Sequence, residues 1–176
     1  MILLGYIFTV INYLFYCLSR FLPHKKDMLF MNLVANLFMV SGLYCLGSIS
    51  GAFAFIINFM ALIAANIKEH LNKKWPLFFI LFQILYLLII IFTYQGISSV
   101  LIFITSSISL FGNWWLKPQA LRFLCGCNSI IFLVYQISIK NWAGLLEIFV
   151  TFSSFGAYLK YRRTKKKPHT TKRRKH

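Results

Sequence analysis

Glu147 is the one carboxylate that stands inside a long apolar stretch of this sequence, whereas Asp27 and Glu69 lie in polar connections. A carboxyl group in such surroundings could exchange a proton or contact a polar solute, because it can be charged or neutral. A structural role is the alternative: a carboxylate near the start of a helix, assisted by Asn141 and Trp142 and stabilised by the positive end of the helix dipole.

Side-chain amides inside apolar stretches offer a second kind of chemistry. They are Asn12, Asn36, Asn58, Asn66, Gln83 and Asn128. An amide can bind a polar solute, and it can equally hydrogen-bond a neighbouring helix. We interpret most of them as links between helices. Asn58, with Asn36 and Asn128, is singled out as a companion of Glu147 along a solute path.

Other reactive side chains do not form a recognisable catalytic or metal-binding pattern. Cys125 and Cys127 are two residues apart, so on a helix their thiols would point about 200° apart. The four histidines show no ligand spacing, and the sequence has no glycine-rich nucleotide loop and no catalytic triad arrangement. We therefore expect no catalytic residue, no metal, no cofactor, no disulfide and no enzymatic activity.

Composition indicates where these residues must be held. Hydrophobic residues make up 59% of the chain, only three residues are acidic, and the mean hydropathy is +0.71. No soluble domain of this length combines these values comfortably, so the sequence predicts an integral membrane protein with the lipid bilayer as its first partner. A net charge of +16 could suggest nucleic acid, but ten of the nineteen basic residues lie from Lys160 onward. We expect no nucleic acid partner.

Hydropathy predicts an all-α protein with seven transmembrane helices. The expected ranges are Ile2–Leu22, Met28–Leu46, Gly51–Ile67, Pro76–Tyr94, Ile97–Leu116, Ala120–Ser138 and Ala143–Tyr161. The fourth lies in the middle of the chain, in the nearly continuous apolar run from Trp75 to Tyr94. Pro76 suits the first turn of a helix, where its missing N–H would have no partner.

Charge in the connections predicts the orientation. Alternate connections and the tail carry eighteen basic residues, interpreted as loop charge, and the other side carries only Lys140. The positive-inside rule then predicts an outside N-terminus and a cytoplasmic C-terminus in the inner membrane of a bacterial cell. Lys140 is also the basic residue that we expect nearest to Glu147.

The tail, residues 162–176, should be disordered and should contact anionic lipids at the cytoplasmic face. Its expected lipid-contact residues are Arg162, Arg163, Lys165, Lys166 and Lys167.

Sliding the chain along itself indicates an internal repeat. With a shift of 91, Gly5 matches Gly96 and Tyr44 matches Tyr135; with a shift of 93, Gly51 matches Gly144. We predict two parallel three-helix repeats, residues 1–67 and 97–161, joined by a loop and linker helix, 68–96. In the second register Glu147 corresponds to a position one turn before Asn58 on the same helical face, whereas in the first the two residues point apart.

The segments Gly42–Ala52 with Asn58, and Asn141–Glu147 after Tyr135, resemble matching halves of the YgjV-type bacterial inner-membrane protein family. The likeness covers residues 5 to 163 and implies a multi-pass inner-membrane protein, with no activity or site residue to carry over. Parallel three-plus-one-plus-three repeats also occur in the SWEET group of transporters, which is an analogy of fold alone.

Two hypotheses of function remain open. The first is a transporter or permease for a small polar solute, with a path between the triplets lined by Asn58, Glu147, Asn36 and Asn128. The second is a non-transporting membrane scaffold or assembly partner, in which the amides only join helices. A transporter needs polar groups that converge at mid-depth, whereas a scaffold scatters them among separate interfaces. Whether the chain forms an oligomer is left open.

Overall fold

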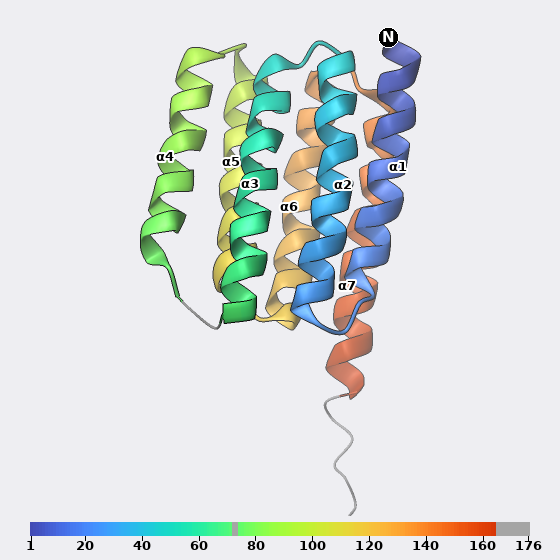
Figure 1. Ribbon diagram of the computed structural model, residues 1–176. Coiled ribbons are helices and arrows are strands. Elements are labelled where there is room, and N and C mark those ends of the chain that lie inside the picture. Colours follow the sequence, from blue (N-terminus) through green and yellow to red (C-terminus); the bar gives the residue numbers. More distant parts are fainter. Residues whose placement is uncertain (72–73, 165–176) are drawn as a thin grey trace, which may run out of the picture.

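The computed structural model describes residues 1–71 and 74–164, and these ranges hold the seven helices that hydropathy predicts (Figure 1). They are α1 (Ile2–Arg20), α2 (Lys25–Cys45), α3 (Ile49–Leu71), α4 (Pro76–Phe92), α5 (Ile97–Trp115), α6 (Pro118–Ser138) and α7 (Glu147–Thr164), with a short 3₁₀ helix, η1 (Trp142–Leu146), before α7. The largest boundary differences are at the end of α3, which continues past the expected Ile67 to Leu71, and at the start of α7, which begins at Glu147 and not at the expected Ala143 because η1 precedes it. Prolines begin both α4 and α6, at positions where a helix needs no N–H donor.

The helices form a closed ring of six with one helix outside it. Around the ring, α1 contacts α2, α2 contacts α3, and α3 contacts α5. The contacts continue from α5 to α6, from α6 to α7, and from α7 back to α1. The fourth helix packs on α3 and α5 at the edge of the bundle (Figure 1). Only Phe82, Tyr86 and Ile90 of α4 are buried, one turn apart along a single stripe. The most apolar helix of the chain is therefore peripheral.

The outer surface of the bundle is apolar, as a bilayer requires. Within the described residues, six helices are at least 18 residues long and apolar enough to span a membrane, and α4 is a shorter apolar helix of 17 residues. At 1.5 Å per residue, α4 is about 25 Å long, close to the thickness of the hydrocarbon core. Large apolar side chains such as Leu87, Phe152 and Ile130 are exposed on different helices.

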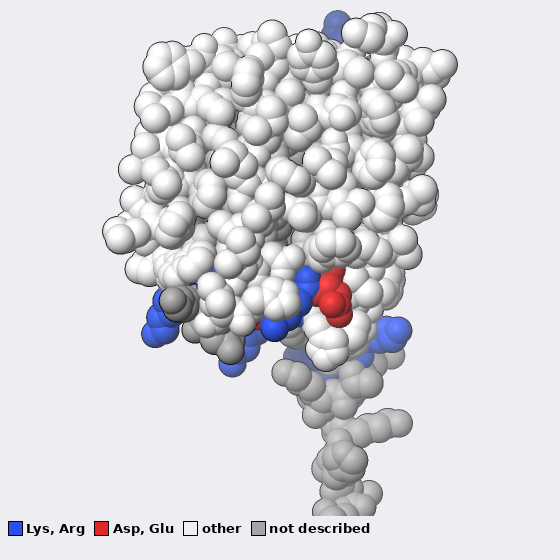
Figure 2. Space-filling model, in the orientation of Figure 1, with Lys and Arg blue, Asp and Glu red and all other residues white. Residues whose placement is uncertain are grey.

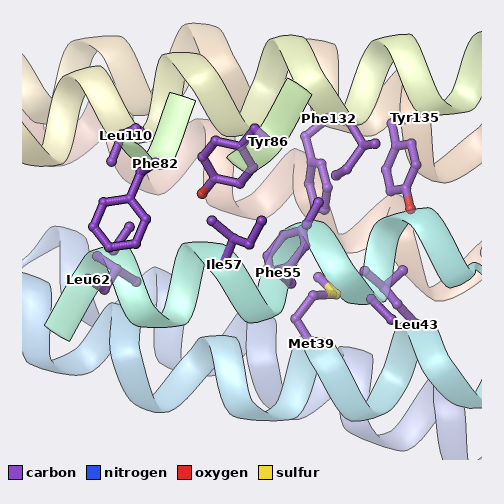
Figure 3. Packing of buried hydrophobic residues seen from close by; sticks show 14 of the residues in the cluster. Met39, Leu43, Phe55, Ile57, Leu62, Phe82, Tyr86, Leu110, Phe132 and Tyr135 are labelled. Carbon is purple, nitrogen blue, oxygen red and sulfur yellow. The ribbon is translucent and has the colours of Figure 1, made fainter. Parts of the chain in front are cut away.

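Inside the ring, aromatic and aliphatic side chains pack between the triplets. Phe55 of α3 and Phe132 of α6 meet with ring centroids 5.6 Å apart. Figure 3 shows this pair beside Met39, and shows Tyr86 reaching from α4 toward α3. Association of helices in lipid depends on such close packing, because lipid tails are as apolar as the side chains.

Basic side chains gather at one end of the bundle, the end at which α7 leaves it (Figure 2). The sequence interpretation of these residues as loop charge is wrong for four of them, since Arg20, Lys25, Lys68 and Arg122 lie within helices and are buried. Three of the four, Lys25, Lys68 and Arg122, have specific polar partners. Arg122 donates to the backbone oxygens of Arg20 and Leu22, which ties α6 to the end of α1.

The internal repeat stays a prediction, as do the domain boundaries drawn from it. The order of contacts around the ring is compatible with a two-fold relation, because α3 against α5 and α7 against α1 would be equivalent pairs. The residues matched in sequence nevertheless occupy different environments. Gly5 packs inside α1 against α2, whereas Gly96 lies in a turn with φ of 86°. Tyr135 is fully buried, whereas Tyr44 is 69% exposed.

Candidate solute site at the centre of the bundle

A polar cavity lies at the centre of the ring. Its volume is about 50 Å³, enough for a few water molecules. Its lining comes from α1, α3, α5, α6 and α7, that is, from both triplets. The polar lining residues are Tyr16, Arg20, Asn58, Thr105, Ser106, Ser109, Cys125, Asn128, Ser129 and Glu147.

Three of the four residues predicted for a solute path, Asn58, Asn128 and Glu147, line this one cavity. The fourth, Asn36, lies behind Asn58: the Asn58 Nδ2 donates to Asn36 Oδ1 at 3.3 Å. The four side chains come from α2, α3, α6 and α7, so only the folded ring brings them together. The proximity of these four side chains follows from the packing of the helices and does not depend on either register of the internal repeat.

A chain of hydrogen bonds connects the cavity to four helices. The Tyr16 hydroxyl of α1 donates to Asn36 Oδ1 at 2.9 Å, and the Tyr86 hydroxyl of α4 donates to Asn58 Oδ1 at 3.3 Å. Asn36 is fully buried, and its Nδ2 has no hydrogen-bond partner among the described residues. A buried donor without a partner costs free energy, so this amide favours a nearby water or solute.

Glu147 begins α7 and is 4% exposed. The hydroxyls of Ser129 and Tyr13 and the guanidinium of Arg20 are its polar neighbours. The expected helpers are placed elsewhere. Asn141 donates instead to Gln136 Oε1 at 2.8 Å, and Trp142 is 62% exposed. The position of Glu147 in the first turn does agree with stabilisation by the helix dipole.

Arg20 is the charged residue of the lining that the sequence analysis missed, and the expectation that Lys140 is the basic group nearest to Glu147 is wrong. Arg20 ends α1, is 4% exposed, and lies with its guanidinium carbon 5.4 Å from the centre of the Tyr16 ring. Its Nε and Nη1 atoms are buried without a hydrogen-bond partner among the described residues. The available signal was its spacing from Tyr16, because residues four apart share a helical face.

Two amides away from the cavity, Asn12 and Gln83, join helices as interpreted from the sequence, whereas the Oδ1 of Asn66 is buried without a hydrogen-bond partner among the described residues. The Asn12 Nδ2 of α1 donates to the Ala35 backbone oxygen of α2 at 2.7 Å. The Ser107 hydroxyl of α5 donates to Gln83 Oε1 of α4 at 3.0 Å. Cys125 lines the cavity, in addition to the packing role expected for it.

The cavity therefore combines one guanidinium, one carboxyl group, two amides and several hydroxyls within an apolar bundle. Such a lining can desolvate a small polar solute and replace its water by hydrogen bonds and charge contacts. None of the expected lipid-contact residues is part of this lining. Arg162 is exposed near the end of α7, while the side chain of Arg163 and residues Lys165, Lys166 and Lys167 lie outside the part that the structure describes.

Comparison of the sequence with known proteins places the chain in a family. The sequence model of the family Imp-YgjV, described as a bacterial inner membrane protein, matches residues 3–165. No curated protein and no solved structure shows significant similarity to the chain.

Proposed function

Since the chain belongs to the Imp-YgjV family of bacterial inner membrane proteins, we propose that it carries a small polar solute across that membrane. The observation that supports this proposal most is the placement of Arg20 and Glu147 at one polar cavity between the triplets. Burying either group inside a membrane protein is costly, and such residues commonly mark solute and ion pathways.

The amides and hydroxyls add the recognition that a carrier needs. Asn58 and Asn128 converge on the cavity from α3 and α6, which belong to different triplets. A cavity of about 50 Å³ is small, so a solute larger than a few waters requires the helices to move apart. The interface between the triplets, where the cavity lies, is the natural place for that movement.

A membrane scaffold is the second candidate, and the Asn12 and Gln83 links are the observation that favours it. Those bonds join neighbouring helices, and neither Asn12 nor Gln83 lines the central cavity. A scaffold has no use for a buried arginine and glutamate beside a void, however, because apolar residues of similar volume would pack there at least as stably. Access of small reagents to the cavity distinguishes the two candidates.

The access experiment uses Asn58→Cys in a background whose four native cysteines are replaced by alanine. In membranes, a small water-soluble thiol reagent should label the new cysteine, since a carrier opens its cavity to water. Gln83→Cys, an amide position on α4 outside the cavity lining, is the matched control and should react slowly. Failure of Asn58→Cys to react, with the protein folded, would contradict the carrier.

Flux then tests the residues. Purified protein in liposomes is given a panel of radiolabelled amino acids, sugars and small organic acids under an imposed pH gradient. For any solute that accumulates, Glu147→Gln should remove the pH dependence of uptake and Asn58→Leu should impair uptake at every pH. Gln83→Leu removes an amide from outside the cavity and should leave uptake unchanged.

A further inference from the structure

A second pocket lies at the basic end of the bundle and shares no lining residue with the central cavity. Its volume is about 500 Å³. Four lysines from separate segments line it: Lys25 of α2, Lys68 of α3, Lys74 before α4, and Lys117 before α6. Trp114 and Trp115, at the end of α5, also line this pocket.

The pocket carries an excess of positive charge. Glu69 is its one carboxylate, and the Lys25 ammonium lies 3.1 Å from Glu69 Oε2. Lys25 therefore has its counter-ion, while the charges of Lys68, Lys74 and Lys117 are not balanced by a carboxylate of the lining. An anion supplied from outside the chain would balance them.

Lys68 is held in place at the base of this pocket. It is 8% exposed, and its ammonium donates a hydrogen bond to the Trp114 backbone oxygen. The ammonium also lies 5.3 Å and 5.1 Å from the ring centres of Trp114 and Trp115. An ammonium has three N–H donors, so the bond to Trp114 leaves donors for an incoming oxygen. The site is thus built around a fixed, desolvated cation.

An apolar surface adjoins the pocket. Phe79 of α4 packs against Trp115 with ring centroids 5.8 Å apart, which places the first turn of α4 beside the wall. Leu77 and Phe78 of that turn are 77% and 45% exposed. A ligand with an anionic head and apolar chains could therefore put its head among the lysines and its chains along α4. Lysine and tryptophan are also the residues that favour the level of lipid headgroups.

We propose that this pocket binds the phosphate of an anionic phospholipid from the leaflet that faces the basic end. Basic pockets between transmembrane helices bind lipid headgroups in this way. The proposal does not depend on transport, because a scaffold would bind the same lipid. It is separate from the lipid contact expected of the tail, because no residue that lines the pocket belongs to the tail.

Binding can be measured on the full-length protein in a zwitterionic detergent, by titration with brominated phosphatidylglycerol and quenching of tryptophan fluorescence. The variant Lys74→Gln/Lys117→Gln removes two exposed charges and leaves Lys68 in place. We expect an apparent affinity about 25-fold weaker, from about fivefold for each lysine near an anionic headgroup. Lys68→Gln should weaken binding further, and Lys68→Arg should retain part of it.

The matched control is Lys26→Gln/Lys140→Gln, which makes the same change in net charge with two exposed lysines outside the pocket. It should leave the affinity within about twofold. Equal weakening by the control would overturn the proposal, because surface charge alone would then explain binding. Equal binding of brominated phosphatidylcholine would exclude recognition of an anionic head. Full competition by millimolar inorganic phosphate would assign the pocket to a free anion instead of a lipid.

Discussion

Arg20 and Glu147 illustrate how much a single residue's role depends on its neighbours in space. Both are more than nine-tenths buried and line the same cavity, yet the one ion pair among the described residues joins Lys25 to Glu69. The guanidinium and the carboxyl group therefore line one cavity without forming an ion pair. Space between two opposite charges in an apolar bundle is where water or a polar solute can be accommodated.

The first prediction tests this coupling. Arg20→Gln and Glu147→Gln should each destabilise the folded protein, because each leaves one buried charge without its compensating neighbour. The double variant should lose less stability than the sum of the two, by about 1 to 3 kcal/mol. Unfolding in detergent, followed by tryptophan fluorescence, gives the four values of the cycle. Strict additivity would show that the two groups do not interact.

At the scale of helices, small residues decide how closely elements approach. Tyr135 of α6 reaches the start of α3, where its hydroxyl lies 2.9 Å from the Ser48 hydroxyl. A Cβ atom on Gly51 would lie 2.0 Å from the same Tyr135 hydroxyl. Gly51 therefore permits the contact between the two triplets at the end of the bundle opposite to the basic end. Close helix approach through small residues is a general feature of membrane proteins.

The second prediction concerns Gly51→Ala. The added methyl group should destabilise the protein by about 1 to 3 kcal/mol, because it overpacks a fixed contact. Tyr135→Phe should lose about 1 kcal/mol by itself, through the bond to Ser48, and should relieve most of the effect of Gly51→Ala in the double variant. Thermal unfolding in detergent measures each variant.

Gly156→Ala is the control for that series. Gly156 lies in the interior of α7, and a Cβ atom there would meet no atom within 4 Å. Alanine is the better helix former by about 1 kcal/mol, so this variant should be neutral or slightly more stable. Equal destabilisation at Gly51 and Gly156 would mean that the close approach of Tyr135 is not what makes Gly51 sensitive to an added methyl group.

The whole molecule is an apolar ring with charge at one end. Figure 2 shows the basic side chains grouped where α7 leaves the bundle, and the ring presents an apolar surface between its two ends. The burial of Arg20, Lys25, Lys68 and Arg122 does not remove this asymmetry, since all four lie at helix ends on the same side. The positive-inside rule depends on residues near helix ends, so it still applies.

The third prediction is the orientation in the membrane. A reporter fused after His176 should lie in the cytoplasm, and one placed before Met1 should lie outside, because seven spans separate the two termini. Alkaline phosphatase and green fluorescent protein fusions report the two sides. Insertion of three lysines into the connection between α2 and α3 should weaken the preference for one orientation. Two cytoplasmic termini would require an even number of spans and would refute the seven-helix topology.

Hydropathy by itself determined the number and position of the helices, because each span needs only about 20 apolar residues and no information from its neighbours. The family match over residues 3–165 agrees with the prediction of a membrane protein. Charge also determined the basic end, and isolated polar residues in apolar stretches indicated Asn58, Asn128 and Glu147, since such residues are costly in lipid wherever they lie.

Only the tertiary structure decided which helix faces meet. Hydropathy could not show that α4 is peripheral, because lipid and protein interior are equally apolar surroundings for its side chains. Nor could it show that Arg20 is buried, since that depends on Arg122, 102 positions away in the sequence, and on Glu147 of the neighbouring helix α7. The surrounding helices decide whether a charged residue near a helix end faces water or a cavity. The sequence of one helix does not show which helices will surround it.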